Sequence, residues 1–389
     1  MPRFMRDRSG HATVTNTELF FDLVYVYAIT QLSVRLVEHP TWGNAAQTAL
    51  LLAMVWNVWV YTTWVTNFLD PDKRPTRLML FAVMLGSLVM SAAIPNAFSG
   101  GDGPDRGLWI GSAYAAMQLG RTGYAVLATR GAAVHNNFIR IFSWCAVSST
   151  LALVGGFVDG PGRGWLWLAA VAFDLLGGFS QFWTPWLGRS ETSEWAVDGA
   201  HFAERCQLFV IIALGESVVA IGSPLADSKS VSALLAFSFV GAFGGAVAFF
   251  WVYFDRTAEQ GVEAITASDD PGKLAAFAFH YVHPLIVAGI ILSAAGDEVV
   301  LHDPGHHATG GTSWFVAGGS GLFLFGHFVY LRLIRDSASL PHLGAIAVLL
   351  VLAPLGGHLT ALTVGMLTLA VLVALLLIDT LTTRRHSQP

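Results

Sequence analysis

The sequence predicts an all-α polytopic membrane protein with about twelve transmembrane helices. Hydrophobic residues make up 54% of the 389 positions and charged residues only 12%, against about 25% charged in ordinary soluble domains. The apolar residues fall in runs of about twenty, the length that crosses the hydrocarbon of a bilayer, and short segments rich in turns and charge separate the runs. So little charge cannot coat a water-facing surface of this size, which excludes an ordinary soluble globule.

The apolar runs define the spans in order along the chain. We predict spans at residues 18–38, 45–69, 77–98, 108–129, 137–158, 165–187, 203–223, 231–254, 273–295, 313–334, 341–357 and 359–381. The last two lie in one apolar tract from His342 to Leu381, where Pro354 and the triplet Gly356-Gly357-His358 predict a turn. One overlong helix there, and eleven spans in all, is the alternative.

The basic residues alternate between the two ends of these spans. With the N-terminus inside, sixteen Lys and Arg lie on the cytoplasmic side, four lie on the outer side, and Arg121 lies within span four. The cytoplasmic set is Arg3, Arg6, Arg8, Lys73, Arg74, Arg77, Arg130, Arg140, Arg189, Arg205, Arg256, Lys273, Arg332, Arg335, Arg384 and Arg385, and the outer set is Arg35, Arg106, Arg163 and Lys229. Because cytoplasmic loops carry the excess of Lys and Arg, both termini are predicted to be cytoplasmic. The outer loop between spans nine and ten then receives Asp297, Glu298, His302, Asp303, His306 and His307.

A faint internal repeat relates each span to the sixth span after it. Glu18 in span one matches Glu204 in span seven, and Trp64 to Asp70 match Trp251 to Asp255. Six is an even number, so this predicts a 6+6 repeat of parallel topology, as in one class of transporters. The predicted parts are a cytoplasmic N-terminal segment 1–17, six-helix halves 18–187 and 203–381, a linker 188–202 and a cytoplasmic tail 382–389.

Charge and motifs exclude several kinds of function. A net charge of −5 gives no reason to expect a nucleic-acid partner. Cys145 and Cys206 both lie in apolar runs, which favours buried thiols over a disulfide. No phosphate-binding loop, dinucleotide fingerprint or nucleophile elbow stands where it could work, so the cofactor stays unknown. The expected partners are the lipid bilayer and a small molecule or ion; the oligomeric state is left open.

The first span opens with two carboxylates. Glu18 and Asp22 are four residues apart and therefore share one helix face, and Tyr25 follows on the same stripe. An ionisable group inside hydrocarbon is costly enough to indicate a functional site. The alternative is an interfacial position in the first helical turn, where the helix dipole favours carboxylates.

Span seven carries a second set of charges. Glu204 and Arg205 are adjacent and cannot face each other on one helix, so each is expected to pair with another span, Arg205 with Asp22. Glu216 follows in the outer half of an apolar helix, where a buried carboxylate needs a cation, a partner or a bound proton. A glutamate that reaches the outer membrane surface is the alternative there.

One arginine and several histidines lie at membrane depth. Arg121 is expected to face protein or water, with Asp174 and Glu216 as candidate partners. His280 and His283 stand three residues apart on one helix face, a spacing that permits joint metal ligation or a proton relay. His327 joins them as a candidate metal ligand, and histidines that only pack between helices are the commoner outcome.

Three motifs resemble the signatures of one family. Glu18-Leu-Phe-Phe-Asp22-Leu-Val-Tyr-Val, His201-x-x-Glu204-Arg205 running on to Gly215-Glu216-Ser217, and His280-x-x-His283-Pro are similar to motifs of the bacterial low temperature requirement A (LtrA) family. The resemblance covers nearly the whole chain and implies a multi-span protein of the bacterial inner (cytoplasmic) membrane, linked by name to growth in the cold. Cys206 and Gln207 depart from the aromatic and small residues expected after Glu-Arg.

The sequence therefore favours a proton- or cation-coupled transporter with intramembrane carboxylates on spans one and seven. The alternative is an intramembrane enzyme, metal-dependent in one version, that uses the histidines with a carboxylate on a lipid or isoprenoid substrate. A structural or sensory membrane protein is a third hypothesis.

Overall fold

Helices carry nearly all of the regular structure. The computed structural model describes residues 4–7, 13–98, 104–192, 195–255, 257–335 and 339–386. Within these ranges no strand forms, and only three isolated β-bridges occur. The predicted all-α class is confirmed. Arg3, Arg8 and Arg256, which contributed to the predicted orientation, lie outside the described residues.

In the described part of the chain, twelve long helices follow the predicted apolar runs. They are α1 (Asn16–Glu38), α2 (Trp42–Phe68), α3 (Arg74–Ala93), α4 (Gly107–Ala128), α5 (His135–Phe157), α6 (Pro161–Phe179), α7 (Gly199–Asp227), α8 (Ala233–Phe254), α11 (His283–His302), α13 (Gly319–Arg335), α14 (Leu340–Leu355) and α15 (Ala361–His386). Short elements connect them: the 3₁₀ turns η1 (Ile94–Asn96) and η5 (Gly356–His358), the helices α9 (Thr257–Thr266), α10 (Pro271–Leu274) and α12 (Gly310–Ser313), and the π-helices η3 (Ala275–Tyr281) and η4 (Trp314–Gly318).

Ten helical stretches in the described part of the chain are long and apolar enough to cross a membrane. Helices α4 and α6 coincide with two further predicted spans but are not among the ten. Each carries polar side chains that lower its hydropathy, Gln118 and Arg121 in α4 and Arg163 and Asp174 in α6. The count of twelve spans and the cytoplasmic termini stay predictions.

Sequence signals place several helix boundaries. Pro75, Pro161, Pro284 and Pro341 stand in the first turns of α3, α6, α11 and α14, where a missing N–H costs nothing. Ser232 caps α8 by accepting a hydrogen bond from the Leu235 amide at 3.1 Å. The predicted turn between the last two spans is confirmed, since α14 ends at Leu355 and α15 begins at Ala361.

Two predicted boundaries are wrong. Span six was expected to reach residue 187, but α6 ends at Phe179 because Gln181, Phe182 and Trp186 adopt positive φ angles that fold the chain into turns. Span nine was expected to end at residue 295, but α11 continues to His302. Asp297, Glu298 and His302 therefore lie on a helix and not in the predicted outer loop.

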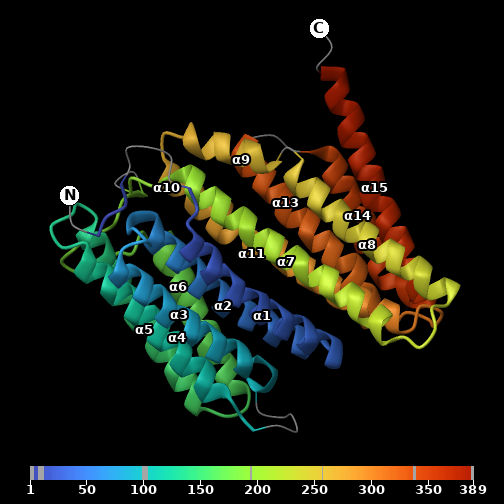
Figure 1. The fold of residues 1–389 in the computed structure, drawn as a ribbon, viewed down its shortest axis with the longest axis horizontal. Coiled ribbons are helices and arrows are strands. Elements are labelled where there is room, and N and C mark those ends of the chain that lie inside the picture. The colour runs from blue at the N-terminus through green and yellow to red at the C-terminus, as the bar shows by residue number, and fades with distance from the viewer. Residues whose placement is uncertain are drawn as a thin grey trace. The chain divides into compact units, whose positions relative to one another are not determined.

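The chain divides into two compact units. The first comprises Met1–Leu32, Ala46–Cys206 and Ile265–Ala276, and the second comprises Ser33–Ala45, Gln207–Ala264 and Phe277–Pro389. In the first unit α3, α4 and α5 lie side by side (Figure 1). A Cβ atom on Gly111 of α4 would lie 2.4 Å from the carbonyl oxygen of Ala152 on α5, so the helices approach this closely only at glycine.

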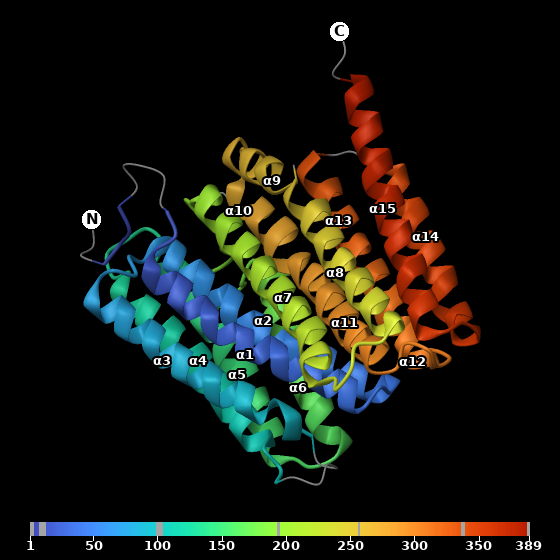
Figure 2. The same cartoon turned by 45° about the vertical axis from the view of Figure 1, so that its right-hand side comes forward.

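In the second unit α11 packs against α13, and α15 contacts both α8 and α14 (Figure 2). Gly289 on α11 faces the backbone of α13: a Cβ there would lie 2.3 Å from the amide nitrogen of Phe323. Small residues at such crossings let backbones approach closely, which is how membrane helices commonly associate. The parallel 6+6 repeat, with its parts at 1–17, 18–187, 188–202, 203–381 and 382–389, stays a prediction.

Candidate functional site

Five ionisable side chains meet in the first unit. We call them the ion cluster: Arg6, Glu18, Asp22, His201 and Arg205. The two acids stand one turn apart on α1, the histidine and Arg205 lie four residues apart on α7, and Arg6 comes from the segment before α1. None of the five is more than 7% exposed. The cluster is therefore enclosed by protein.

Arg205 holds both carboxylates of the cluster. Its Nη2 and Nε donate to Asp22 Oδ1 and Oδ2 at 2.7 and 3.2 Å, and its Nη1 donates to Glu18 Oε1 at 3.0 Å. Nη1 also lies 3.4 Å from the Thr66 hydroxyl on α2. The guanidinium uses its planar fork on one acid and its remaining donors on the other, an arrangement that lysine could not reproduce.

Glu18 accepts hydrogen bonds at both oxygens. Oε1 accepts from Arg205 and from His201 Nε2, each at 3.0 Å. Oε2 accepts from Arg6 Nη2 at 2.9 Å, from the Thr15 amide at 3.0 Å and from the Thr15 hydroxyl at 3.1 Å. A fully buried carboxylate with this many donors is stable as an anion, because its lost hydration is replaced.

Asn67 determines the tautomer of His201. The Asn67 side chain accepts from the Asp198 amide at 3.0 Å through Oδ1, so its Nδ2 is the donor to the Asp198 carbonyl at 2.9 Å and to His201 Nδ1 at 3.2 Å. His201 Nδ1 therefore accepts, and Nε2 carries the proton that is donated to Glu18. A neutral imidazole satisfies every contact of the ring.

Aromatic side chains close the cluster, whose formal charges balance. The Trp59 indole on α2 donates to Asp22 Oδ1 at 2.8 Å. The Arg205 guanidinium carbon lies 5.8 Å from the rings of both Trp59 and Phe21, within the range of a cation–π contact. Two carboxylates and two guanidiniums then cancel, with His201 neutral. Such a cluster is stable only while all partners stay in place.

The contacts of these residues can be compared with the predictions for spans one and seven. The predicted pairing of Arg205 with Asp22 is confirmed. The expected pairing of Glu204 with another span is wrong, because its side chain points about 100° away from Arg205 on the helix and is exposed. Tyr25 is buried, and its hydroxyl hydrogen-bonds Ser87 on α3 at 3.0 Å. Glu18 and its repeat match Glu204 thus differ in burial.

Sequence reasoning missed the arginine from the N-terminal segment and the indole donor. Arg6 precedes the first apolar run and belongs to no helical pattern, so nothing in the sequence indicated that it folds back on Glu18. Trp59 stands among other tryptophans in an apolar run, and nothing in that pattern indicates a hydrogen-bond donor to Asp22. The motif that contains His201 was the one available signal for the imidazole.

A second polar network in the first unit surrounds Arg121. The guanidinium is 1% exposed; its Nη1 donates to the Val58 carbonyl of α2 at 3.0 Å and its Nη2 to the Gln118 side-chain oxygen. Gln118 in turn donates to Asp174 Oδ2 of α6 at 3.1 Å. The expected direct pairing of Arg121 with Asp174 is therefore wrong: Gln118, one turn before Arg121 on α4, lies between them. Glu216 belongs to the second unit, so its pairing with Arg121 stays a prediction.

Buried polar atoms remain unsatisfied in this second network. Asp174 Oδ2 also accepts from the Tyr114 hydroxyl. Arg121 Nε and Asp174 Oδ1 have no hydrogen-bond partner among the described residues. Unsatisfied buried polar atoms are uncommon in folded proteins, and ordered water commonly satisfies such atoms.

In the second unit the histidines separate into two groups. His283 Nδ1 donates to the Ala278 carbonyl at 3.0 Å, so Nε2 of the neutral ring accepts from the Tyr253 hydroxyl at 2.7 Å. Both nitrogens of His283 are thus engaged in hydrogen bonds. His280 lies in the π-helix η3 and is also buried.

The other histidine group forms a hydrogen-bonded chain. His327 Nε2 lies 3.2 Å from the Thr257 hydroxyl, and its Nδ1 lies 3.0 Å from Nε2 of His342. His342 Nδ1 lies 2.8 Å from the Ser339 hydroxyl and 3.9 Å from an oxygen of Asp379. Each contact can carry its proton on either side, so the chain has two opposite orientations.

The metal hypothesis receives no support from the geometry. Among the described residues no group of three or more His, Cys, Asp or Glu is arranged to hold a metal ion. The candidate ligands His283 and His327 use their ring nitrogens in the contacts above. Glu216 is 3% exposed on α7, and its role stays a prediction. Cys145 and Cys206 are free and buried, as predicted.

Comparisons with known proteins cover most of the chain. The family model of the bacterial low temperature requirement A protein matches residues 13–377. An uncharacterized protein of Rhizobium meliloti (strain 1021) is 35% identical over 326 residues, which are 82% of this chain and 78% of that relative. No solved structure matches.

Proposed function

Because the chain belongs to the bacterial low temperature requirement A family, and because its first unit buries a balanced set of charges, we propose that it is a proton- or cation-coupled transporter of the bacterial inner membrane. The protein is a multi-pass membrane protein with many apolar helices. In this proposal the ion cluster is the coupling site. The second polar network and the histidine chain assist proton movement.

The enclosed, charge-balanced ion cluster carries the proposal. If Glu18 or Asp22 took up a proton, Arg205 would lose one of its two counter-charges and the cluster would hold a net positive charge away from water. Leaving a buried charge without its partner typically costs about 3–5 kcal/mol. Protonation is therefore favourable only if the helices around the cluster also move, and this link between a proton and a conformation is what coupled transport requires.

Helix α2 connects the ion cluster to the second network. The Trp59 indole binds Asp22, while the carbonyl of its neighbour Val58 accepts from Arg121. A shift of α2 that breaks one of these contacts changes the other. Intramembrane ionisable groups linked in this way are typical of ion and proton pathways.

The histidine chain in the second unit fits a role in proton transfer. A proton that enters at Thr257 can leave at Ser339 when the hydrogen bonds through His327 and His342 reverse in sequence. Imidazole suits this role because each ring nitrogen can donate or accept. The intramembrane enzyme remains the alternative, and no observation favours it over transport.

The proposal can be tested with charge movement in a supported membrane. Wild-type protein in liposomes should give a transient current when the external pH is lowered in one step. D22N keeps the shape of the side chain but removes its charge change, and it should abolish the current. E204Q removes an exposed carboxylate of the same region and should leave the current unchanged.

Gel filtration and thermal unfolding of D22N show whether the variant is folded, and only folded protein is compared. A wild-type current equal to that of protein-free liposomes would contradict the proposal. So would a folded D22N variant that responds like the wild type.

A further inference from the structure

Asp297 stands beside a small cavity in the second unit and belongs to none of the three motifs that carry the family resemblance. It lies on α11, one turn from Ser293. Both residues line the cavity, together with residues of α8, α13, α15 and the π-helix η4. The cavity has a volume of about 30 Å³. Such a volume holds a small ion with a water molecule and is too small for an organic substrate.

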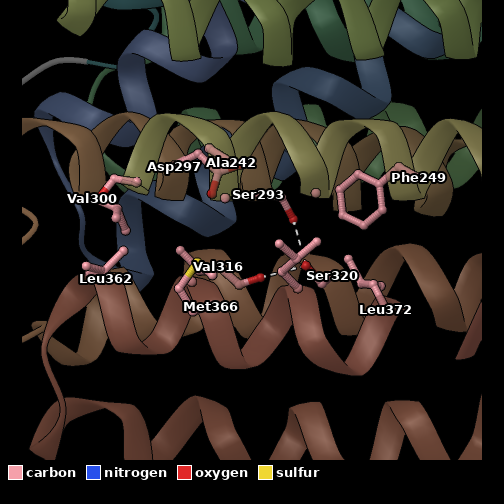
Figure 3. A pocket seen from close by; sticks show the side chains of 15 residues that line it. Ala242, Phe249, Ser293, Asp297, Val300, Val316, Ser320, Leu362, Met366 and Leu372 are labelled. Carbon is pink, nitrogen blue, oxygen red and sulfur yellow. Dashed lines mark hydrogen bonds between the residues drawn. The ribbon is translucent and has the colours of Figure 1, made fainter. Parts of the chain in front are cut away.

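Three serine hydroxyls line the same cavity. Ser320 donates to the Val316 carbonyl at 2.9 Å, so the contact of 3.4 Å between Ser293 and Ser320 is a donation from Ser293. The oxygen of Ser293 is then left as an acceptor. Figure 3 shows Asp297 and Ser293 pointing toward the helices that carry Val316 and Ser320.

The third hydroxyl belongs to Ser238. Ser238 on α8 is 3% exposed, and its Oγ makes no hydrogen bond within the described residues. A buried hydroxyl without a partner loses its hydration with no replacement. Its position in the lining of the cavity indicates that a bound group supplies the missing contact.

The charge in the cavity is also uncompensated. The lining contains one carboxylate and no Lys, Arg or His, and its other residues are Ser, Gly, Ala and larger apolar side chains. No ion pair joins Asp297 to another described residue. To stay ionised, a carboxylate in such surroundings needs a cation.

We propose that this cavity binds one monovalent metal cation, Na⁺, through the Asp297 carboxylate and the hydroxyl oxygens of Ser238 and Ser293. One carboxylate balances one positive charge, whereas divalent cations in proteins take several oxygen ligands with more than one carboxylate in tight sites. Val316 lies in η4, and π-helical segments are frequent at functional sites. Water in the cavity completes the coordination.

Sodium binding is measured on the purified full-length protein in detergent. Titration with ²²Na⁺ in choline chloride at constant ionic strength should saturate at about one ion per chain. D297N should lower the affinity at least tenfold, and S238A and S293A, which keep the charge, should lower it several-fold. E298Q, which removes the neighbouring acid outside the cavity, and S223A, which removes an exposed serine of the same unit, should bind as the wild type does.

The measurement needs no transport, so its outcome is independent of the proposed function. Absence of saturable sodium binding to the wild type would overturn the proposal. Binding by folded D297N with wild-type affinity would do the same. If sodium leaves the thermal stability of the wild type unchanged while D297N alters its pH dependence, Asp297 holds a proton, and the metal-ion proposal is overturned. Should D297N fail to fold, unchanged binding by both S238A and S293A is the contradicting result.

Discussion

The Arg205 guanidinium donates two hydrogen bonds to Asp22, from Nη2 to Oδ1 at 2.7 Å and from Nε to Oδ2 at 3.2 Å. The two residues lie 183 positions apart in the chain, one on α7 and the other on α1. Both side chains are buried, and the same guanidinium also holds Glu18 at 3.0 Å. This contact joins α1 to α7 through a charge pair. Removal of either partner leaves the other as a buried charge without this counter-charge.

Removal of Arg205 is expected to destabilise the protein strongly. R205A leaves two buried carboxylates with Arg6 as their remaining counter-charge, and the expected loss in the free energy of unfolding is about 3–5 kcal/mol. E204Q changes the exposed neighbour and should stay within about 0.5 kcal/mol of the wild type. Unfolding in mixed micelles with increasing SDS measures both. An R205A curve that superimposes on the wild type would show that the cluster does not hold α1 to α7.

Asp105 predicts a pH dependence of stability near the ends of α4 and α6. Arg163 donates two hydrogen bonds at 2.6 Å to the Asp105 carboxylate, and this lowers the pKa of Asp105 from 3.8 to about 2. The folded state therefore favours the anion. Its contribution to stability is complete above pH 3.8 and is lost as the pH falls toward 2.

D105N should remove this part of the acid sensitivity. Thermal unfolding in a non-ionic detergent between pH 6 and pH 2 should show a smaller loss of stability for D105N than for the wild type. D159N removes a carboxylate that is 80% exposed and contacts Arg163 at 3.2 Å, so its pH profile should follow the wild type. Parallel profiles for D105N and wild type would exclude the ion pair as the cause.

Gly289 predicts a steric limit at the crossing of α11 and α13. A Cβ at this position would lie 2.3 Å from the Phe323 amide nitrogen, so G289A forces the two backbones apart. Overpacking of this kind costs about 1–3 kcal/mol in the free energy of unfolding. A Cβ on Gly222 of α7 would meet no atom within 4 Å, and G222A should be neutral or stabilise the helix by up to about 1 kcal/mol.

Unfolding curves of the two alanine variants, measured side by side, test this limit. The expected order of stability is G289A below the wild type, with G222A equal to it or above it. Equal stability of the two variants would mean that α11 and α13 separate without cost.

The histidine chain predicts a kinetic effect on proton movement. H327A and H342A each interrupt the chain between Thr257 and Ser339. If the loss of one hydrogen bond raises the activation free energy of proton transfer by about 1.4 kcal/mol, the transfer slows about tenfold. H302A removes an exposed histidine on α11 and should have no effect. The decay rate of the pH-step current reports the difference. Equal rates for H327A, H342A and H302A would show that protons do not use the chain.

The sequence alone determined the helical class and most helix boundaries, because apolar runs of membrane-spanning length form helices from local composition. Pro354 and the glycines after it were enough to predict the break between α14 and α15. The pairing of Arg205 with Asp22 was also predictable, since a buried guanidinium in an apolar chain has few acids to choose from.

Only the tertiary structure decided which charges face inward. It buried Arg205 and exposed Glu204, brought Arg6 to Glu18, and placed Gln118 between Arg121 and Asp174. It also extended α11 far enough to put Asp297 against a cavity. These outcomes depend on the rotation of each helix about its axis and on the helices that it packs against. Helices far apart in sequence determine both through their packing, and a local pattern of residues does not contain that information.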